Sequence, residues 1–475
     1  MSIFIPLAYA EESMITLFPL EKYNQTLSAW IHPESDDFNT PLMSAETQQA
    51  RTQLFYEHYC GKYSPWDSAF VNQLLTGELK SIETEVMNAF DNTGKPDEKI
   101  GYAEDFRPYQ KAWIAAIAEN INLEQFDSVY YRAENRAITV DNLHARVLPT
   151  DDPYFYSHTI PGEGYPFDNL QMSALWAGTP VYVIGETRDH LWMLVITSDY
   201  IAWVKSAGVA YTDNHFVSEW KRSAQAQLVA ISKTQTSVLD NNNHALFSAY
   251  VGAVFPGVAT SSGFEINIPV KNKKQLARIK KSAVSSENAV LMPLSATPHN
   301  FSTMMNTLIG RPYGWGGMYF YNDCSAELKN LFTPFGIWLP RHSSNQVTVS
   351  KMDDLSASSP EERLAYLIQH GKKFLTIVYI GGHVVMYVGH DDATVMSYQN
   401  IWGLAPNPST KRVVIGQAVL FPLLLQYPED PGLVSLAAKK YFQIAYLDQL
   451  PESDKLYQGN VVNIRNWMFP EKSEW

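Results

Sequence analysis

Residues 11–128 have the pattern of helices separated by short breaks. Ser44-Ala45-Glu46-Thr47 is a helix-capping signal, and the stretch from Gln48 to Tyr59 continues without Pro or Gly. A second helical stretch runs to Ala89, and a third spans Tyr109 to Glu119. We therefore expect a mostly helical N-terminal domain.

The pattern changes to short β-type runs between turns rich in Gly, Pro and Asp. The first set, expected to form a small closed barrel over residues 129–209, contains Val129–Arg132, Ala137–Val140, Val181–Ile184 and Trp192–Ile196. The second set, expected to form another small β domain over residues 210–290, contains Gln227–Ile231, Ser237–Leu239 and Phe247–Phe255. Two β domains in succession are therefore predicted.

Residues 291–475 combine helices with an antiparallel sheet. Pro293 and Pro298 flank a linker before them. The expected helices are Phe301–Gly310, Ser325–Phe335 with a stop at Gly336, and Tyr441–Leu450, and the expected strands are Phe374–Ile380, His383–Val388 and Thr394–Gln399. This order predicts an α+β fold class for the domain.

Composition and charge narrow the classes of function. The chain has 475 residues, 45% hydrophobic and 18% charged, which is typical of a folded protein with several domains. The formal net charge of -13 disfavours nucleic acid as a partner, and the basic run from Lys271 to Lys281 is best interpreted as a solvated face. No stretch approaches the ~18 apolar residues of a membrane helix.

The N-terminus carries a weak export signal. Ile3 to Tyr9 is a short apolar run, and Ala8 and Ala10 fit a signal-peptidase site after Ala10, although no Lys or Arg precedes the run. We expect residues 1–10 to be a truncated signal peptide and the protein to be periplasmic or otherwise exported. A cytoplasmic protein with an apolar N-terminus stays the alternative.

Two cysteines occur, and their contexts differ. Cys60 and Cys324 are far apart, which excludes a disulfide framework and makes a poor zinc site. Asp323 is a strong N-cap residue, so Cys324 is expected in the first turn of a helix, where free N–H groups and the helix dipole favour a thiolate. The same N–H groups can stabilise an oxyanion. Cys324 is therefore a candidate nucleophile.

A histidine and an amide complete the candidate site. Gly381-Gly382 predicts a two-residue hairpin turn, with His383 opening the next strand and able to point toward a helix N-terminus. Gln399 on the following strand can accept a hydrogen bond from His383 and fix its tautomer. A one-residue shift in register would place Asn400 there instead. We expect His383 to hold Cys324 as a thiolate.

These residues resemble the NlpC/p60 family of bacterial cysteine peptidases, which cut peptidoglycan stem peptides. The matching blocks are Arg311-Pro312-Tyr313-Gly314-Trp315-Gly316-Gly317, Asp323-Cys324-Ser325, Gly336 to Ser343 with Gln346, and His383 to Gly389. Upstream, the stretches Asn142–Thr150, Gly164–Gln171 and Ala202–Val204 resemble the first bacterial SH3-like (SH3b) domain of multidomain members, and Ser64-Pro65-Trp66 resembles part of their helical region.

The resemblance implies a papain-like catalytic domain preceded by two SH3b domains. It also implies cleavage of the γ-D-Glu–diamino acid bond of murein stem peptides with a free N-terminal L-Ala, and a role in murein recycling. The substrate-binding residues that it implies are Asp323, Ser325, Tyr313, Trp315, Tyr200 and Gln171, the last standing where some relatives have an acidic residue.

Two other functions remain open at this point. One is a catalytically silent cell-wall-binding protein, and the other is a related Cys–His amidase or acyltransferase that uses the same thioester. For the peptidase we expect a monomer that needs no metal or cofactor and acts on stem peptides or muropeptide fragments.

Overall fold

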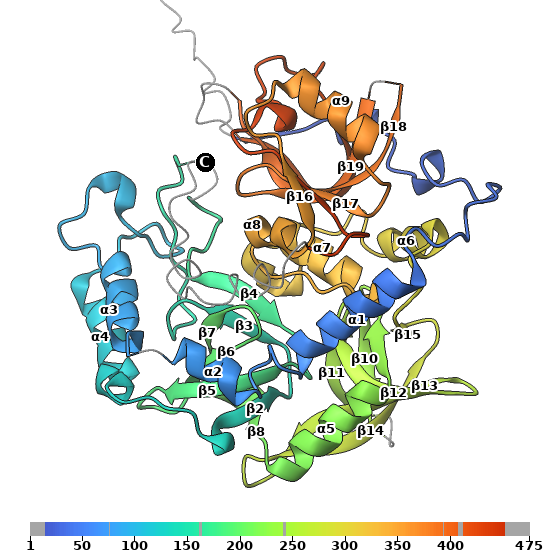
Figure 1. The fold of residues 1–475 in the computed structure, drawn as a ribbon. Coiled ribbons are helices and arrows are strands. Elements are labelled where there is room, and N and C mark those ends of the chain that lie inside the picture. Colours follow the sequence, from blue (N-terminus) through green and yellow to red (C-terminus); the bar gives the residue numbers. More distant parts are fainter. Residues whose placement is uncertain are drawn as a thin grey trace, which may run out of the picture.

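The computed structural model describes residues 15–451 except 76, 161–163, 241–243, 393 and 407–411. The expected signal peptide at residues 1–10 lies outside the described residues. The described chain folds into helices and four β-sheets, arranged as an α+β protein (Figure 1).

The N-terminal region is helical, as expected. Its helices are α1 (Ala45–Tyr59), α2 (Ser68–Leu74), α3 (Leu79–Phe90) and α4 (Lys111–Ile121). Ser44 caps α1 by accepting a hydrogen bond from the Thr47 backbone at 3.1 Å, as the capping signal predicts. The expected strand at Val129–Arg132 is wrong, because that segment is irregular and leads into a short 3-10 helix.

The first β unit is a seven-stranded sheet in the order β4-β3-β7-β6-β5-β2-β8. Its strands are β2 (Arg136–Thr139), β3 (Leu143–Arg146), β4 (Gln171–Leu175), β5 (Pro180–Glu186), β6 (Trp192–Ile196), β7 (Ile201–Lys205) and β8 (Val209–Tyr211). Trp203 is fully buried at its centre. The long connection between β3 and β4 contacts the C-terminal unit, where the Arg412 side chain donates to the backbone oxygens of His158, Ile160 and Tyr165.

The second β unit contains a helix that the sequence pattern did not lead us to expect. Helix α5 (Asn214–Ala226) is capped by Asp213 and buries Phe216, Val217 and Trp220 on one face. The strands are β9 (Leu228–Ile231), β10 (Gln235–Leu239), β11 (Ala245–Tyr250), β12 (Val254–Thr260), β13 (Gly263–Lys271), β14 (Ala277–Ser285) and β15 (Ala289–Met292). They form a five-stranded sheet, β14-β13-β12-β9-β15, and a hairpin, β10-β11.

The C-terminal unit is built on a seven-stranded sheet in the order β1-β20-β19-β18-β17-β21-β16. Its strands are β1 (Ile15–Leu17), β16 (Lys351–Asp354), β17 (Thr376–Tyr379), β18 (Val384–Asp391), β19 (Thr394–Leu404), β20 (Arg412–Leu423) and β21 (Gln443–Tyr446). The helices are α6 (Pro298–Asn306), α7 (Cys324–Phe332), α8 (Ser343–Gln346) and α9 (Pro360–His370), with short 3-10 helices η7 (Trp315–Phe320) and η10 (Leu436–Ala438).

Two expectations for this unit are wrong. Pro298 is the first residue of α6 rather than part of a linker, because its fixed φ and missing N–H suit the first turn of a helix. The segment Tyr441–Leu450 is not a helix, since Gln443–Tyr446 forms β21 and pairs with both β16 and β17.

Helix α1 contacts all three β units and lies across them in Figure 1. Arg51 is 2% exposed and donates to the backbone oxygens of Val349 and Leu447 in the C-terminal unit. Tyr59, at the other end of α1, donates to the backbone oxygen of Gly178 in the first β unit and of Val254 in the second β unit. Hydrogen bonds from one helix therefore fix the three units relative to one another.

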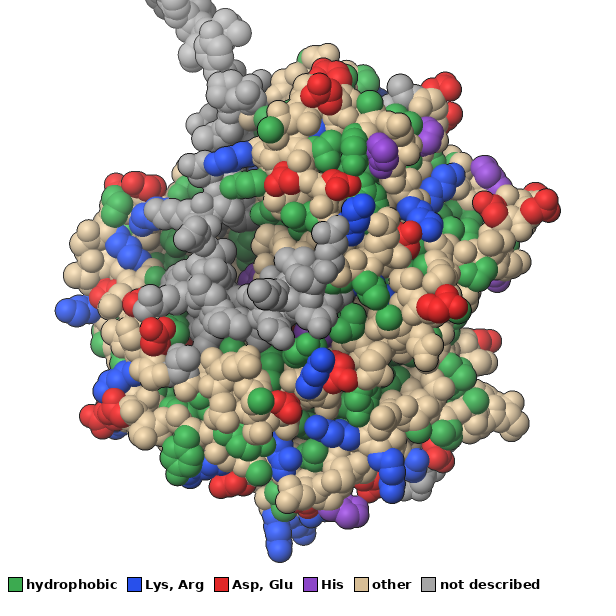
Figure 2. Space-filling view, in the orientation of Figure 1, with side chains coloured by type: hydrophobic (Ala, Val, Ile, Leu, Met, Phe, Trp, Pro, Cys, Tyr) green, Lys and Arg blue, Asp and Glu red, His purple; other side chains and the backbone are tan. Residues whose placement is uncertain are grey.

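The surface shows no extended patch of one charge on the face drawn in Figure 2, where acidic and basic side chains are scattered among other types. Within the described ranges, no helix is long and apolar enough to cross a membrane.

Candidate active site

The Cys324 side chain lies at the start of α7. Asp323 caps this helix, because its side chain accepts a hydrogen bond from the Ala326 backbone at 3.0 Å. The Cys324 side chain is nearly buried, and the backbone N–H groups of Val384 and Ser325 lie near enough to its sulfur to offset part of the rise in its pKa. The first of these contacts brings the start of β18 against the cysteine.

His383 immediately precedes β18 and therefore lies beside Cys324. The turn before it has Gly381 at φ 83° and Gly382 at φ 67°, a left-handed pair that glycine adopts without strain. Nε2 of His383 lies 2.7 Å from Oε1 of Gln399. Because Gln399 Nε2 donates to Ser397 Oγ at 2.8 Å, its amide oxygen is the group that faces the imidazole. Nε2 of His383 is then the donor, and Nδ1 is left as the basic nitrogen.

Asn400 has a different environment. Its Nδ2 donates to the backbone oxygen of Asn322 at 2.9 Å and to the Glu327 carboxylate at 3.4 Å. Successive residues of a strand point to opposite faces, so β19 presents Gln399 to His383 and Asn400 to α7. The register therefore brings Gln399, and not Asn400, to the histidine.

Burial shifts both titratable members of the site toward their neutral forms. It raises the pKa of Cys324 to about 12 and lowers the pKa of His383 to about 4. This opposes the expectation that His383 holds Cys324 as a thiolate in the free protein. The amide of Gln399 carries no charge that would favour an imidazolium. A neutral thiol beside a neutral imidazole is the resting arrangement that these directions support.

Arg341 links the residues that flank the cysteine. Its guanidinium pairs with Asp323, donates to Ser325 Oγ at 2.6 Å, and donates to Ser173 Oγ at 2.9 Å. Ser173 belongs to β4, so one buried side chain joins the start of α7 to the first β unit. The Pro340-Arg341 motif was visible in the sequence, but nothing in it indicated this partner.

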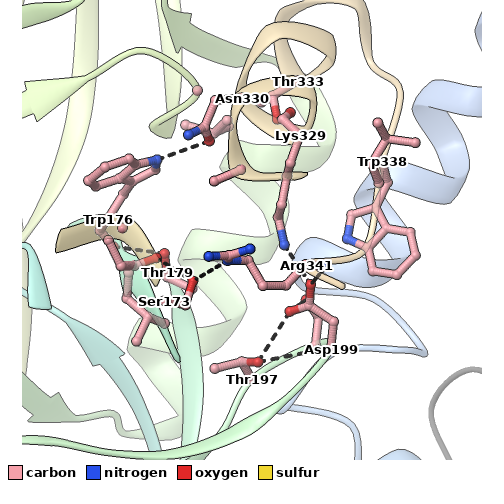
Figure 3. Close-up of a pocket in the computed structure, with 18 of the residues that line it drawn as sticks. Ser173, Trp176, Thr179, Thr197, Asp199, Lys329, Asn330, Thr333, Trp338 and Arg341 are labelled. Atoms are coloured by element: carbon pink, nitrogen blue, oxygen red, sulfur yellow. Dashed lines mark hydrogen bonds and ion pairs between the residues drawn. The ribbon is translucent and has the colours of Figure 1, made fainter. Parts of the chain in front are cut away.

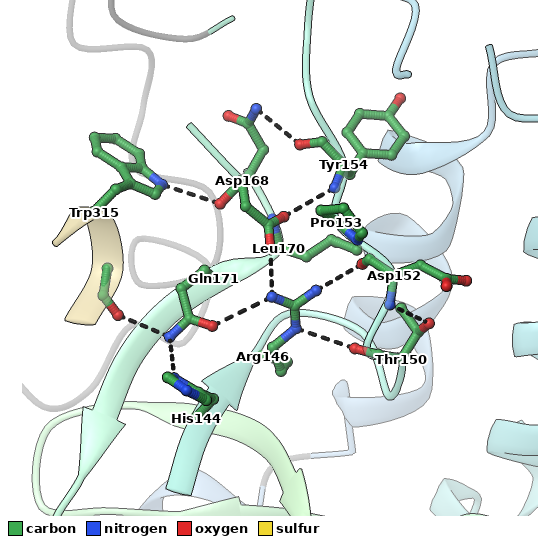
Figure 4. Close-up of polar contacts among 12 residues, drawn as sticks. His144, Arg146, Thr150, Asp152, Pro153, Tyr154, Asp168, Leu170, Gln171 and Trp315 are labelled. Atoms are coloured by element: carbon green, nitrogen blue, oxygen red, sulfur yellow. Dashed lines mark hydrogen bonds and ion pairs between the residues drawn. The ribbon is translucent and has the colours of Figure 1, made fainter. Parts of the chain in front are cut away.

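Gln171 lies at the start of β4, and its carboxamide is fully engaged (Figure 4). Nε2 donates to the backbone oxygens of Ser173 and Gly316, both at 2.9 Å, and Oε1 accepts from Arg146 at 3.2 Å. A Cβ at Gly316 would come within 2.4 Å of the Gln171 backbone oxygen, so only glycine permits this approach. Gln171 thus docks β4 onto the loop before Cys324, and its buried carboxamide is used in contacts within the protein.

Aromatic side chains from two units meet next to this junction. Trp315 donates from its indole nitrogen to the Asp168 backbone oxygen at 3.0 Å (Figure 4). The Phe167 ring lies edge-on to Trp315 at 4.9 Å and to Trp402 at 5.2 Å. Tyr313 is 6.1 Å from Trp402. The first β unit therefore inserts an aromatic ring between two tryptophans of the C-terminal unit.

Tyr200 belongs to the first β unit and is not among the residues that contact Cys324 in this structure. It is 4% exposed and lines a cavity of about 130 Å³ between the units, together with Asp199, Lys329 and Arg341 (Figure 3). Lys329 pairs with Asp199 at 2.6 Å across this cavity. Cys324 is not among the residues that line this cavity.

Both cysteines are free thiols. In the part of the chain that the structure describes, no three His, Cys, Asp or Glu side chains are grouped so that they could hold a metal ion.

Comparisons with known proteins find a matching domain and a similar overall structure. A family model for the SH3 domain of the SH3b1 type matches residues 153–205. The structure is similar to that of an NlpC/P60 endopeptidase from Photobacterium damselae subsp. piscicida, with 26% sequence identity, a TM-score of 0.77, and coverage of 92% of this chain and 100% of that chain. An NlpC/P60 family protein from Bacillus cereus ATCC 10987 is 14% identical over 66% of this chain and 99% of that chain, with a TM-score of 0.44.

The TM-score of the second comparison is too low to support a conclusion about this chain. A search of the curated proteins found no match. The first likeness spans almost the whole of both chains, and the SH3b match falls on the first β unit, upstream of the Cys324 helix. The chain carries an SH3b domain, and over almost its whole length its structure is similar to that of an NlpC/P60 endopeptidase.

Proposed function

We propose that this protein is an exported peptidoglycan endopeptidase that hydrolyses the γ-D-Glu–diamino acid bond of stem peptides with a free N-terminal L-Ala. The observation that carries the proposal is the hydrogen bond of 2.7 Å between His383 and Gln399, made beside a cysteine at a helix N-terminus. The similarity to an NlpC/P60 endopeptidase over nearly the whole chain supports this class of reaction.

The proposed chemistry begins with a proton transfer. Nδ1 of His383 takes the proton of the Cys324 thiol as the sulfur attacks the carbonyl carbon of the γ-D-Glu residue. The backbone N–H of Cys324, at the positive end of α7, stabilises the oxyanion. Because the free pair is neutral, the thiolate forms only in this step. The amide oxygen of Gln399 keeps the imidazole in its productive tautomer throughout.

The second half of the reaction returns the protein to its starting state. His383 gives its proton to the departing amine of the diamino acid, which leaves a thioester between Cys324 and the acyl group. His383 then removes a proton from a water molecule, which attacks the thioester and releases the peptide acid. His383 finally gives the proton that it took from water to the Cys324 sulfur, which restores the thiol.

The domain arrangement fits a groove that is closed at one end. In this proposal residues 129–209 form the first SH3b domain, residues 210–290 a second SH3b-like domain, and residues 291–475 the catalytic domain. Tyr313, Trp315, Asp323 and Ser325 line the groove. Gln171 and Tyr200 contribute by docking the first SH3b domain, since both are buried and the Gln171 carboxamide bonds to groups within the protein.

Product analysis of two matched substrates tests the proposal. The protein is incubated with the tripeptide L-Ala-γ-D-Glu-diaminopimelate and with the same stem attached to muramic acid, and products are identified by mass spectrometry. We expect L-Ala-D-Glu and free diaminopimelate from the tripeptide and far less product from the muropeptide. Amine-capped dipeptide in the presence of an added amine would indicate an acyltransferase, and no product from either substrate would indicate a wall-binding protein.

A further inference from the structure

Ser397 lies beside Gln399 on β19, outside the sequence blocks that resemble the family. Residues two apart on a strand point to the same side of a sheet, and both side chains are fully buried. Gln399 Nε2 lies 2.8 Å from Ser397 Oγ, and Ser397 Oγ lies 2.7 Å from the backbone oxygen of Phe421 on β20. A chain of hydrogen bonds therefore leads from the backbone of β20 to the carboxamide that faces His383.

The Ser397 hydroxyl has one proton, and its neighbours fix where that proton points. A backbone oxygen accepts hydrogen bonds and never donates them, so the proton is directed at Phe421. The Ser397 oxygen is then an acceptor toward Gln399, and only the nitrogen of the carboxamide can supply that proton. This order of donors turns the amide oxygen toward His383, whose Nε2 must carry a proton to bond to it at 2.7 Å.

The reversed carboxamide is the poorer arrangement. If the Gln399 nitrogen faced His383, the Ser397 hydroxyl would have to turn to the amide oxygen and leave the Phe421 oxygen. Two of the three hydrogen bonds would then remain, among residues that are largely shut off from water. The proton of the neutral imidazole would move to Nδ1, the nitrogen that the proposed reaction needs as its base. The direction of one hydroxyl group thus decides between a productive and an unproductive histidine.

The acceptor end of this chain of hydrogen bonds is held firmly in place. Phe421 pairs with Ser397 across β19 and β20, and the Phe18 ring lies edge-on to the Phe421 ring at 5.4 Å. Gln25 bonds to both backbone groups of the neighbouring Leu420, its Nε2 donating to the oxygen and its Oε1 accepting from the N–H, each at 2.9 Å. The carbonyl that receives the Ser397 proton therefore belongs to a strand segment fixed by β19 and by the N-terminal residues.

We propose that Ser397 is a positioning residue that, through Gln399, holds the proton of His383 on Nε2 and keeps Nδ1 free to take the proton of Cys324. The assignment rests on the proposed function, because it concerns the base of that reaction. It adds β20 to the elements that orient the candidate site.

Nitrogen NMR of protein containing isotope-labelled histidine tests the assignment directly, because the shifts of the two ring nitrogens show which one carries the proton. The signals of His383 are identified by their loss in His383→Gln. Burial lowers the pKa of His383 to about 4, so the ring is neutral at neutral pH and its tautomer can be read there. We expect Nε2–H in the wild type. In Ser397→Ala, where neither direction of the amide is favoured, we expect about half Nδ1–H.

The kinetic consequence should appear in kcat. Part of the Ser397→Ala protein has the unproductive tautomer and the ring is held less firmly, so kcat on L-Ala-γ-D-Glu-diaminopimelate should fall about 2- to 10-fold with KM little changed. Ser397→Thr keeps a hydroxyl at this position and should restore both the Nε2–H tautomer and kcat.

Ser282→Ala is the matched control. Ser282 is 3% exposed and donates to the Leu239 backbone oxygen at 2.7 Å in the second β unit, so its loss removes the same kind of buried bond outside the candidate site. Its tautomer and kcat should equal those of the wild type. The assignment is overturned if the wild type carries Nδ1–H, a result that needs no variant, or if Ser397→Ala keeps Nε2–H alone. If the wild type shows Nε2–H but cleaves no stem peptide, the proposed function is wrong, and the tautomer of Ser397→Ala still decides whether Ser397 orients the ring.

Discussion

The histidine of the candidate site is oriented by an amide rather than by a carboxylate. Gln399 fixes the ring of His383 through one oxygen, which is itself fixed by the bond from Gln399 Nε2 to Ser397. An amide orients the imidazole but supplies no negative charge to stabilise an imidazolium. The resting thiol is therefore expected to be neutral and to react only when a substrate positions its carbonyl.

The pH dependence of alkylation tests this neutral resting state. In a Cys60→Ala protein, where Cys324 is the remaining thiol, the rate of iodoacetamide labelling should rise about tenfold per pH unit between about pH 6 and pH 10. The thiolate fraction grows in this way below the raised pKa of about 12, while His383 stays neutral above its lowered pKa of about 4. A rate that is already high and flat from about pH 5 to pH 8 would indicate a preformed thiolate–imidazolium pair.

The sequence predicted the roles of single residues well where those roles depend only on neighbours along the chain. Asp323 as a helix cap and the turn at Gly381-Gly382 follow from backbone chemistry alone. The choice between Gln399 and Asn400 depends on strand register, which no local pattern determines. The occupied carboxamide of Gln171 also could not be predicted, because its partners come from two different units.

Helix α7 is attached to β19 by a buried polar cluster. The carboxylate of Glu327 is completely buried and accepts hydrogen bonds from the Tyr398 hydroxyl, from Asn322 Nδ2 at 2.8 Å and from Asn400 Nδ2 at 3.4 Å. Because α7 carries Cys324 and β19 carries Gln399, this cluster sets the distance between the two ends of the candidate catalytic set. Glu327 is a positioning residue in this account.

Removing one donor from the cluster should weaken both stability and turnover. Tyr398→Phe leaves the buried Glu327 carboxylate with one bond fewer, so we expect the free energy of unfolding to fall by about 1–3 kcal/mol in urea titrations. The kcat should fall and KM should change little, because the substitution alters how α7 is placed against β19 and leaves the groove residues unchanged. The matched control is Tyr387→Phe on the adjacent strand, whose hydroxyl contacts the exposed His390 at 2.8 Å and should matter less. Equal stability of Tyr398→Phe and wild type would contradict the positioning role.

The elements that sequence patterns missed share a physical cause. Helix α5 is amphipathic and capped by Asp213, so its signal was present among stronger β-type runs on either side. Strand β21 is too short to show a period, and it forms because β16 and β17 flank it on both sides. Its identity depends on tertiary pairing rather than on local preference.

The units of the molecule are joined by buried side chains rather than by linkers. Arg51 and Tyr59 of α1 contact all three β units, and Arg341 connects the start of α7 to β4. The order of the units could be expected from motifs, but these contacts could not, since each joins residues more than 100 positions apart. We therefore expect the chain to unfold as a coupled whole.

One buried histidine and two partly buried ones should make the whole molecule sensitive to mild acid. Burial lowers the pKa of His58 to about 3 and of His342 and His383 to about 4. Unfolded histidines bind protons near pH 6.5, so between about pH 6.5 and pH 4 the unfolded chain binds more protons and stability falls as pH falls. Each histidine contributes at most roughly 3 kcal/mol over this window.

Thermal unfolding measured from pH 7 to pH 4 checks this prediction. His58 stacks on Trp338 at 3.5 Å, and neither ring nitrogen has a hydrogen-bond partner among the described residues. His58→Phe should therefore keep the stack and remove part of the acid sensitivity. An unfolding temperature that does not change between pH 6.5 and pH 4.5 in the wild type would contradict the buried neutral state of these histidines.

The central claim, that Cys324 is the nucleophile of a peptidase, is tested most directly by the turnover of L-Ala-γ-D-Glu-diaminopimelate in three proteins. Wild type and Cys60→Ala should release diaminopimelate at similar rates, because Cys60 is a buried residue at the C-terminal end of α1, where its backbone N–H bonds to the Tyr56 oxygen. Cys324→Ala should release none above background. Equal release by Cys324→Ala and wild type would show that the reaction does not pass through this cysteine.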